Sequence, residues 1–242
     1  MSLAAIAQKQ EEPTVVPNVK EGKGKTGKPY WDFPKEPLLL KKVEMWFPKI
    51  DKPHLNELYP SAEPKYSATF VLGSDTESEN VQLLYNTINK IAERDFVRQT
   101  KKAGKVVASV PLGFSDLKEE KLKLKSISDD PEKPGAFAGQ WYFNASMGAW
   151  GNVEVFRRSN EPGKKIELMT PDEIAVIGNG SIVTVNISLQ GYYIKDDNFG
   201  VKALLHGVLV QSAKAKGFQA DNAGVFGGIE LDDDVEDDEV PF

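Results

Sequence analysis

The chain has 242 residues, of which 40% are hydrophobic and 10% aromatic, enough for one large folded domain or two small ones. It contains no cysteine and only two histidines, which excludes disulfides, thiol catalysis, thiolate metal sites and a zinc site built from histidines. The formal net charge is −6, but eight acids lie within the ten residues from Glu230 to Glu239. Outside this block 30 basic residues stand against 28 acidic ones, so the net charge describes the C-terminal segment and not the rest.

Composition divides the chain into three parts. Residues 1–29 lack hydrophobic periodicity and are expected to form a flexible basic leader. Residues 30–212 hold nearly all the large apolar side chains and are expected to form one domain, followed at 213–242 by a flexible linker and an acidic tail that repels itself. No apolar run approaches the roughly 20 residues of a membrane span, and the first residues lack the basic region of a secretory signal. We therefore expect a cytoplasmic protein without membrane contact.

Short stretches of alternating apolar and polar residues predict strands in the middle part. These stretches are Leu38–Phe47, Tyr66–Leu72, Gln140–Met147, Val153–Arg158, Ser181–Leu189 and Val201–Val210. Between the second and the third, apolar residues from Val81 to Phe96 recur at helical spacing after Ser78, which predicts a helix with Ser78 as its N-cap. The charged stretch Leu117–Pro134 is expected to be a loop.

Six or so short strands with one helix among the early ones are typical of a small closed barrel of the oligonucleotide/oligosaccharide-binding (OB) type. A β-sandwich would give a similar pattern, and periodicity alone does not separate the two folds. The expected fold is mainly β: an OB-type barrel of five or six strands with one inserted helix, a disordered leader and an acidic tail.

Candidate catalytic groups are few. His206 lies in an apolar strand, where a packed and hydrogen-bonded histidine is the commoner role, and His54 lies in a Pro-rich loop. Paired acids such as Asp129–Asp130 occur at turns without the ligand spacing of a calcium loop. The segment Gly22–Lys28 matches the core of a phosphate-binding P-loop, but Pro29 replaces the Ser or Thr that would hold magnesium. We expect no enzymatic activity, no cofactor and no metal site.

Aromatic residues beside basic ones form the most informative pattern of the middle part. Such rings stack on the bases of single-stranded nucleic acid, at about 1–3 kcal/mol per base, while Lys and Arg follow the phosphates. Because successive strand residues point to opposite faces, adjacent rings cannot all be core unless both faces are covered. The candidate DNA-binding residues are Lys41, Lys42, Trp46, Phe47, Lys49, Trp141, Tyr142, Phe143, Phe156, Arg157, Arg158, Tyr192, Tyr193 and Lys195.

The last six residues form a second pattern. They are Asp237, Asp238, Glu239, Val240, Pro241 and Phe242. They resemble the C-terminal tip of bacterial single-stranded DNA-binding proteins, which has three aspartates, isoleucine, proline and phenylalanine; Glu239 and Val240 are the two departures. Phe242 can fill an apolar pocket, Pro241 limits the entropy lost on docking, and the acids steer the encounter. The resemblance implies that these residues bind partner proteins.

The chain from Leu38 to Phe242 resembles phage-encoded single-stranded DNA-binding proteins. The stretches that support the resemblance in the middle part are Phe137–Ser146, Gly180–Asn186 with Tyr192–Tyr193, and Gly200–Val210. The resemblance implies an OB barrel, sequence-independent binding of single-stranded DNA, and an acidic tail that recruits replication and recombination proteins in the infected host cell. The charge of the tail also suggests that it competes with DNA for the basic groove.

Other functions remain open at this point. A strand-annealing or recombination mediator would form rings or filaments on DNA, and a metal-dependent nuclease would use clustered acids. An acidic DNA-mimic inhibitor would need acids over the folded surface, whereas the body is nearly neutral. The sequence leaves the oligomeric state undetermined, including a homo-oligomer.

Overall fold

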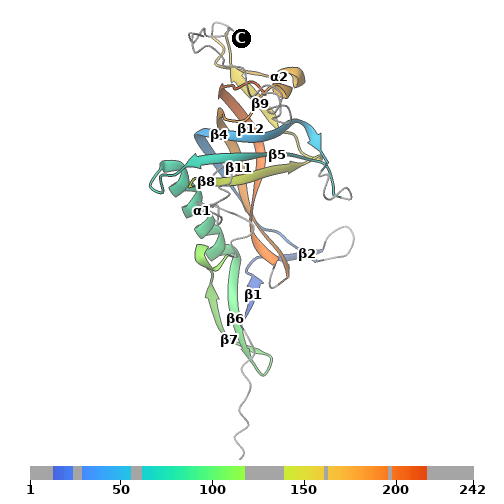
Figure 1. Ribbon diagram of the computed structural model, residues 1–242. Helices are drawn as coiled ribbons and strands as arrows, with labels where there is room; N and C mark the ends of the chain where they lie inside the picture. Colours follow the sequence, from blue (N-terminus) through green and yellow to red (C-terminus); the bar gives the residue numbers. More distant parts are fainter. Residues whose placement is uncertain are drawn as a thin grey trace, which may run out of the picture.

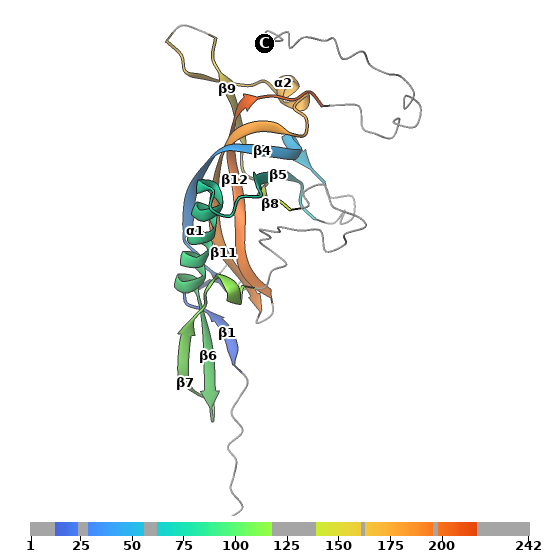
Figure 2. The ribbon, with the colours of Figure 1, turned by 60° about the vertical axis from the view of Figure 1, so that its left-hand side comes forward.

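The computed structural model describes residues 13–23, 29–55, 62–117, 139–160, 163–195 and 198–216. Five long strands form the centre of the molecule (Figures 1 and 2). They are β4 (Lys35–His54), β5 (Lys65–Gly73), β8 (Trp141–Gly148), β11 (Ser181–Lys195) and β12 (Asn198–Ser212). Each of these strands contains a stretch that the alternating pattern predicts, except that β8 begins at Trp141, one residue after the predicted Gln140.

The five strands close into a barrel, which decides against the sandwich alternative. Neighbouring strands pair in the order β4, β5, β8, β12, β11 and back to β4. Only the β8–β12 pairing in this ring is parallel. Closure depends on β4, whose first half pairs with β11 and whose second half pairs with β5. This strand bends at Lys42 and Phe47, two residues with positive φ of 53° and 50° that interrupt its regular pairing.

The barrel interior is filled by the inward-pointing members of the predicted alternation. Leu40, Phe70, Phe143, Ile187 and Leu205 are all at most 1% exposed. The predicted helix is confirmed as α1 (Glu79–Asp95), which packs Leu84, Ile88 and Ile91 against the same core. Ser78 holds the N-cap position as expected, without a side-chain capping bond.

Several shorter elements were not expected from the sequence. They are β1 (Thr14–Pro17), β2 (Glu21–Lys23), β3 (Pro29–Trp31), β6 (Phe96–Lys102), β7 (Lys105–Pro111), η1 (Phe114–Asp116), β10 (Ile166–Leu168) and α2 (Pro171–Ala175). The predicted strand at Val153–Arg158 is present as β9 (Glu154–Arg158), which extends the barrel sheet by pairing with β12 and β10. The β6–β7 hairpin follows α1 directly and projects below the barrel in both views (Figures 1 and 2).

Part of the predicted flexible leader is therefore paired. Strand β1 pairs with β6, and the backbone N–H of Asn18 donates to the carbonyl of Asp95 at 2.7 Å. Backbone pairing with a strand far along the chain stabilises this segment, and composition alone does not reveal it. Residues 1–12 and 24–28 of the leader, 118–134 of the predicted loop, and 217–242 of the linker and tail lie outside the described residues. No helix among the described residues is long and apolar enough to span a membrane.

Candidate nucleic-acid interface

The outer face of β5 and β8 is lined with small polar side chains. In an OB barrel the second and third strands, with the loops beside them, form the oligonucleotide surface, and here these strands are β5 and β8. Ser67 lies opposite Ser146, and Thr69 lies opposite Asn144. The Thr69 hydroxyl donates to Asn144 Oδ1 at 2.6 Å, so the two strands are also joined through their outward side chains.

Lysines from three strands gather beside these polar residues. Lys202 on β12 lies opposite Gln190 on β11, and Gln190 lies opposite Lys35 on β4, so the three form a row across the sheet. Lys65 stands at the start of β5. Burial lowers the pKa of Lys202, and the charges of Lys35 and Lys65 lower it further. The row therefore concentrates positive charge, which a bound phosphate would neutralise.

His206 extends the row along β12. Its Nε2 lies 2.7 Å from the hydroxyl oxygen of Ser188 on β11, which confirms the expectation of a hydrogen-bonded histidine. Burial, followed by the charge of Lys35, lowers the pKa of His206 below its ordinary value of 6.5. The imidazole is thus neutral at neutral pH and adds polar groups to this face without a charge.

An exposed indole covers the end of β8. Phe143, Ala145 and Met147 point inward, so Gly148 faces outward, where it pairs with Lys65. A Cβ atom on Gly148 would lie 2.4 Å from Trp150 Nε1, which places the Trp150 ring directly over this glycine. Trp150 is 73% exposed. A ring lying open beside a lysine is the arrangement that single-stranded nucleic acid requires.

A cavity of about 420 Å³ adjoins the lysine row. Its walls are Trp31, Phe33, Gln190, Gly191, Tyr192, Tyr193, Ile194 and Lys202. The rings of Trp31 and Tyr193 meet edge to face at 6.1 Å, and burial raises the pKa of Tyr192 to about 12, so its phenol stays protonated. Because Gln190 and Lys202 belong to both features, the cavity continues the lysine row.

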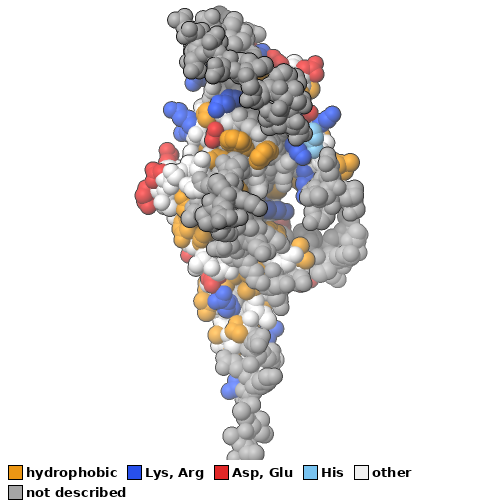
Figure 3. Space-filling model, viewed as in Figure 1, with side chains coloured by type: hydrophobic (Ala, Val, Ile, Leu, Met, Phe, Trp, Pro, Cys, Tyr) orange, Lys and Arg blue, Asp and Glu red, His pale blue; other side chains and the backbone are white. Residues whose placement is uncertain are grey.

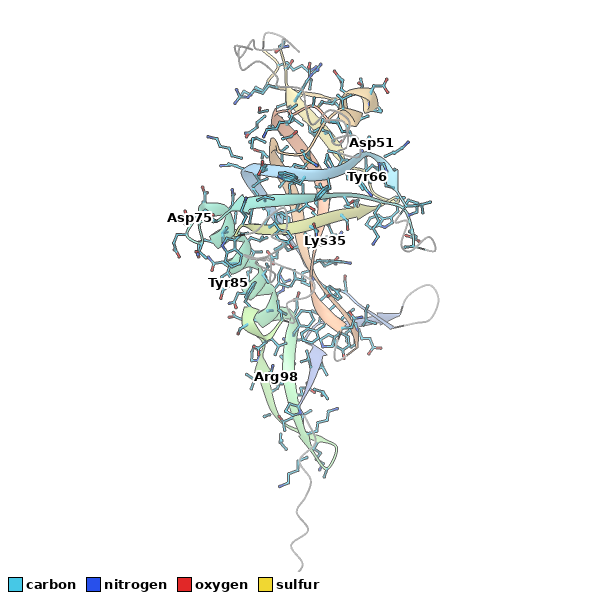
Figure 4. All side chains as sticks on the ribbon, viewed as in Figure 1. Lys35, Asp51, Tyr66, Asp75, Tyr85 and Arg98 are labelled. Carbon is cyan, nitrogen blue, oxygen red and sulfur yellow. The ribbon has the colours of Figure 1, made fainter. Side chains whose placement is uncertain are left out.

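Acidic side chains border the face on one side. Asp75, Glu77 and Glu79 are exposed where β5 leads into α1. Figure 3 shows this acidic group at the left edge of the molecule, and Figure 4 labels Asp75 there. Phosphates would be repelled from this edge, so a bound strand would have to run along the lysines instead.

Three of the predicted DNA-binding residues, all on β4, lie near the polar outer face of β5 and β8. Trp46 pairs with Thr69 and Lys49 pairs with Ser67, which brings both beside the outer face of β5. The rings of Trp46 and Phe47 are 6.1 Å apart, and Phe47 is 52% exposed. Asn179 Oδ1 accepts the backbone N–H of Phe47 at 2.6 Å, which stabilises the bend at this residue.

The three consecutive aromatics of β8 have different environments. Tyr142 and Trp141 are half-buried, at the end of the strand that pairs with Val71 and Gly73. Phe143 is only 1% exposed, and its ring lies 5.4 Å from Phe70 in the barrel core. The prediction of Phe143 as a DNA contact is wrong, because the pleat turns it inward while it exposes its neighbours.

The remaining predicted residues are scattered. Lys41 and Lys42 are exposed near the start of α1, where the Asn80 side chain donates to the Lys41 carbonyl at 2.8 Å. Phe156, Arg157 and Arg158 lie on β9. Arg157 forms ion pairs with Glu167 at 2.5 Å and Glu173 at 2.7 Å. Lys195 ends β11, and its side chain lies outside the described residues. These residues lie away from the polar outer face of β5 and β8 and from the lysine row, and their contact with DNA stays a prediction.

The candidate set from the sequence missed Lys35, Lys65, Trp150 and Lys202. A signal existed for Lys202, since it is the one basic residue in the apolar run from Phe199 to Leu205 and must point outward. Trp31 also belongs to the site, although β3 was not expected. Among the described residues, no group of three or more His, Asp or Glu side chains is placed to hold a metal ion.

Comparison with known proteins shows similarity of structure only. No protein-family model matches the sequence, and no curated protein is significantly similar to it. The single-stranded DNA-binding protein from bacteriophage Enc34 shares 20% identity at a TM-score of 0.50, covering 89% of this chain and 99% of that one. The structure of that protein in complex with single-stranded DNA gives 21% identity and a TM-score of 0.50, over 86% and 99%. The chain thus has the fold of a phage single-stranded DNA-binding protein, as the sequence resemblance implied.

Proposed function

We propose that the protein binds single-stranded DNA without regard to sequence and without enzymatic activity. It would act in phage DNA replication, recombination and repair in the cytoplasm of the infected host cell. One observation is the main support: the row of Lys35, Gln190 and Lys202, with Lys65 nearby, adjoins the aromatic cavity, and Trp150 lies beside Lys65. The lysines hold phosphates and the rings stack on bases, which are the two interactions that single-strand binding combines.

The arrangement of the face suggests the path of the strand. Trp150 over Gly148 receives one base beside Lys65, and the cavity of Trp31 and Tyr193 receives another beside Lys202. Between them Ser67, Ser146 and their neighbours offer short polar groups. Stacking accepts every base, because each has a π-face, so this face does not select a sequence. Trp46, Phe47, Lys49 and Tyr142 extend the same surface as proposed contacts.

The fold comparison supports the proposal. The Enc34 protein of the same fold is known in complex with single-stranded DNA. The second and third barrel strands form the oligonucleotide surface of OB folds, and here these strands, β5 and β8, bear the outward Ser, Thr and Asn side chains. The proposal thus agrees with both the fold and the chemistry of one particular face.

For the acidic tail we propose two roles that rest on its sequence. The segment Asp237–Phe242 recruits replication and recombination proteins by inserting Phe242 into an apolar pocket of the partner. The eight acids from Glu230 to Glu239 compete with DNA for the lysines of the barrel face. Both roles follow from charge and from the resemblance of the tip.

A fluorescence titration with oligo(dT) at several salt concentrations tests the DNA-binding proposal. Replacing Lys35, Lys65 and Lys202 by Gln should weaken binding and lower the slope of log K against log salt by about 0.7 for each phosphate that is no longer neutralised, or about 2 in total. The matched control replaces Lys101, Lys102 and Lys105 by Gln at the tip of the β6–β7 hairpin. Both triple variants are titrated with an oligonucleotide that is long enough for one protein molecule only. If the unaltered protein ignores oligo(dT) at low salt, or if both triple variants behave alike, the proposal is wrong. The same titration with duplex DNA and with RNA oligonucleotides measures whether the protein prefers single-stranded DNA to these ligands.

A further inference from the structure

Strand β7 forms an exposed edge of the small sheet β1–β6–β7. All seven of its residues are exposed, and no described strand pairs with its outer side. The stretch from Val106 to Val110 contains no charge and no proline. Val106, Val107 and Val110 are 50%, 57% and 59% exposed. An uncharged, β-branched strand edge of this kind pairs readily with another strand.

The edge strand of the barrel sheet is protected by contrast. Strand β10 ends that sheet and is three residues long. It contains Glu167, which pairs with Arg157 at 2.5 Å, so a charge occupies the middle of this edge. Short length and charge are the usual protections of an edge strand, and β7 has neither within its central stretch.

We propose that β7 pairs antiparallel with β7 of a second copy of this chain. A second copy presents the same uncharged and exposed strand edge, and the distribution of charge selects the direction of pairing. The tip of the hairpin is basic, with Lys101, Lys102 and Lys105, whereas near its base Asp116 is paired with Arg98 at 2.9 Å. Antiparallel pairing about a two-fold axis places the basic tip of one hairpin near the neutralised Arg98–Asp116 pair of the other, while parallel pairing would set the lysines of the two tips side by side.

The size of the contact determines how it acts. One strand edge of seven residues buries much less than the about 800 Å² per partner that stable complexes bury. Free copies therefore associate weakly. Two copies bound side by side on one DNA strand face each other at an effective concentration of about millimolar, so the same contact becomes cooperative binding. This consequence rests on the proposed DNA binding, whereas the strand pairing does not.

A cysteine scan of the full chain tests the pairing without DNA. The natural sequence has no cysteine, so single replacements of Val107, Ala108, Ser109 and Val110 by Cys each report one position. A two-fold pair brings only one or two neighbouring positions close to their own copies, and a disulfide needs Cα atoms within about 7 Å. Oxidation of concentrated protein should give disulfide-linked dimers at least about tenfold faster at the position nearest the two-fold axis than at a position two residues away. Uniform rates at all four positions, or no dimers at any, would overturn the proposal.

A charged substitution tests the consequence on DNA. Val110 lies opposite Arg98 on β6, so Val110→Glu keeps the hairpin stable while it places a charge on the edge. The matched control is Leu168→Glu, at a 62% exposed residue on β10. On long oligo(dT), Val110→Glu should lower the cooperativity about tenfold and Leu168→Glu should not. The cooperative role would be overturned if both variants lost cooperativity equally or if Val110→Glu lost none. It would also be overturned if Val110→Glu weakened binding equally on an oligonucleotide that holds one protein molecule. If no variant binds DNA, the proposed function fails and the cysteine scan still decides the pairing.

Discussion

Ser188 and His206 are joined by a 2.7 Å hydrogen bond between the serine hydroxyl and Nε2, which links β11 to β12 on the outer face of the barrel. The bond keeps the imidazole beside the row of Lys35 and Lys202, and both burial and Lys35 favour its neutral form. This position makes His206 a reporter of negative charge on the face.

The pKa of His206 should rise when DNA binds. In the free protein it lies below 6.5, so the folded state disfavours the imidazolium and loses stability as the pH falls below that value. Phosphates near the ring favour the imidazolium, so binding to oligo(dT) should strengthen as the pH falls through the pKa. NMR titration of the His206 ring with and without oligo(dT) measures the shift, and His54 beside Asp51 serves as the internal control. An unchanged pKa of His206 at saturation would show that phosphates do not reach β12.

Trp150→Ala should weaken binding to single-stranded DNA by about 1–3 kcal/mol, the value of one stacked base, with little change in stability because the ring is 73% exposed. The matched control is Tyr85→Ala on α1, whose ring is 41% exposed and packs against Phe114 instead. Tryptophan fluorescence quenching and an oligo(dT) titration provide the measurements. An equal effect of the two substitutions would exclude Trp150 as a stacking platform.

Neighbouring residues of β8 should differ in what they stabilise. Phe143→Ala removes a core ring and should lower the free energy of unfolding by about 3–5 kcal/mol. Tyr142→Ala, one position away on the outer face, should cost less stability and reduce the affinity for DNA. Urea denaturation and an oligo(dT) titration of both variants separate the two roles. Equal stability losses would contradict the placement of Phe143 in the core.

The end of α1 contains an ion pair whose acidic member is buried. Asp95 is fully buried, and Arg94 binds its carboxylate through Nε at 2.6 Å and through Nη2 at 2.9 Å. Arg94→Met should destabilise the fold by about 3 kcal/mol, since it removes the partner of the buried Asp95 carboxyl group and also the ion pair with Glu36. Arg98→Met breaks the exposed pair with Asp116 and should cost under about 1 kcal/mol. Chemical denaturation compares the two, and similar losses would refute the buried role of Arg94.

Deleting Glu230–Phe242 should tighten binding to oligo(dT) at low salt and change little at high salt, because the competing acids act through screened charge. Phe242→Ala should keep the DNA affinity and abolish capture of replication proteins by the immobilised full chain. A deletion that leaves the affinity unchanged would rule out competition. Partners that still bind the Phe242→Ala protein would rule out the phenylalanine as their anchor.

Much of the barrel could be predicted because the signals for its elements are local. Alternation from Ser181 to Leu189 places Val183, Val185 and Ile187 on one face whatever the strand pairs with, and helical spacing after Val81 predicts α1 in the same way. The hairpin β6–β7 was missed because all residues of β7 are exposed. Neither face of this strand has to be apolar, so its sequence does not alternate between apolar and polar residues. Strand β1 was missed because its pairing with β6 depends on residues far along the chain.

The sequence by itself determined the five barrel strands, β9, helix α1 and the charge of the C-terminal segment, since these follow from spacing and composition. Only the tertiary structure decided that the sheet closes as a barrel, that Phe143 points inward, and that Trp150 lies over Gly148 beside Lys65. Likewise, Lys35 and Lys202 lie near opposite ends of the sequence yet form one row, with Gln190 between them. The physical reason is that strand register brings together residues that no local pattern relates.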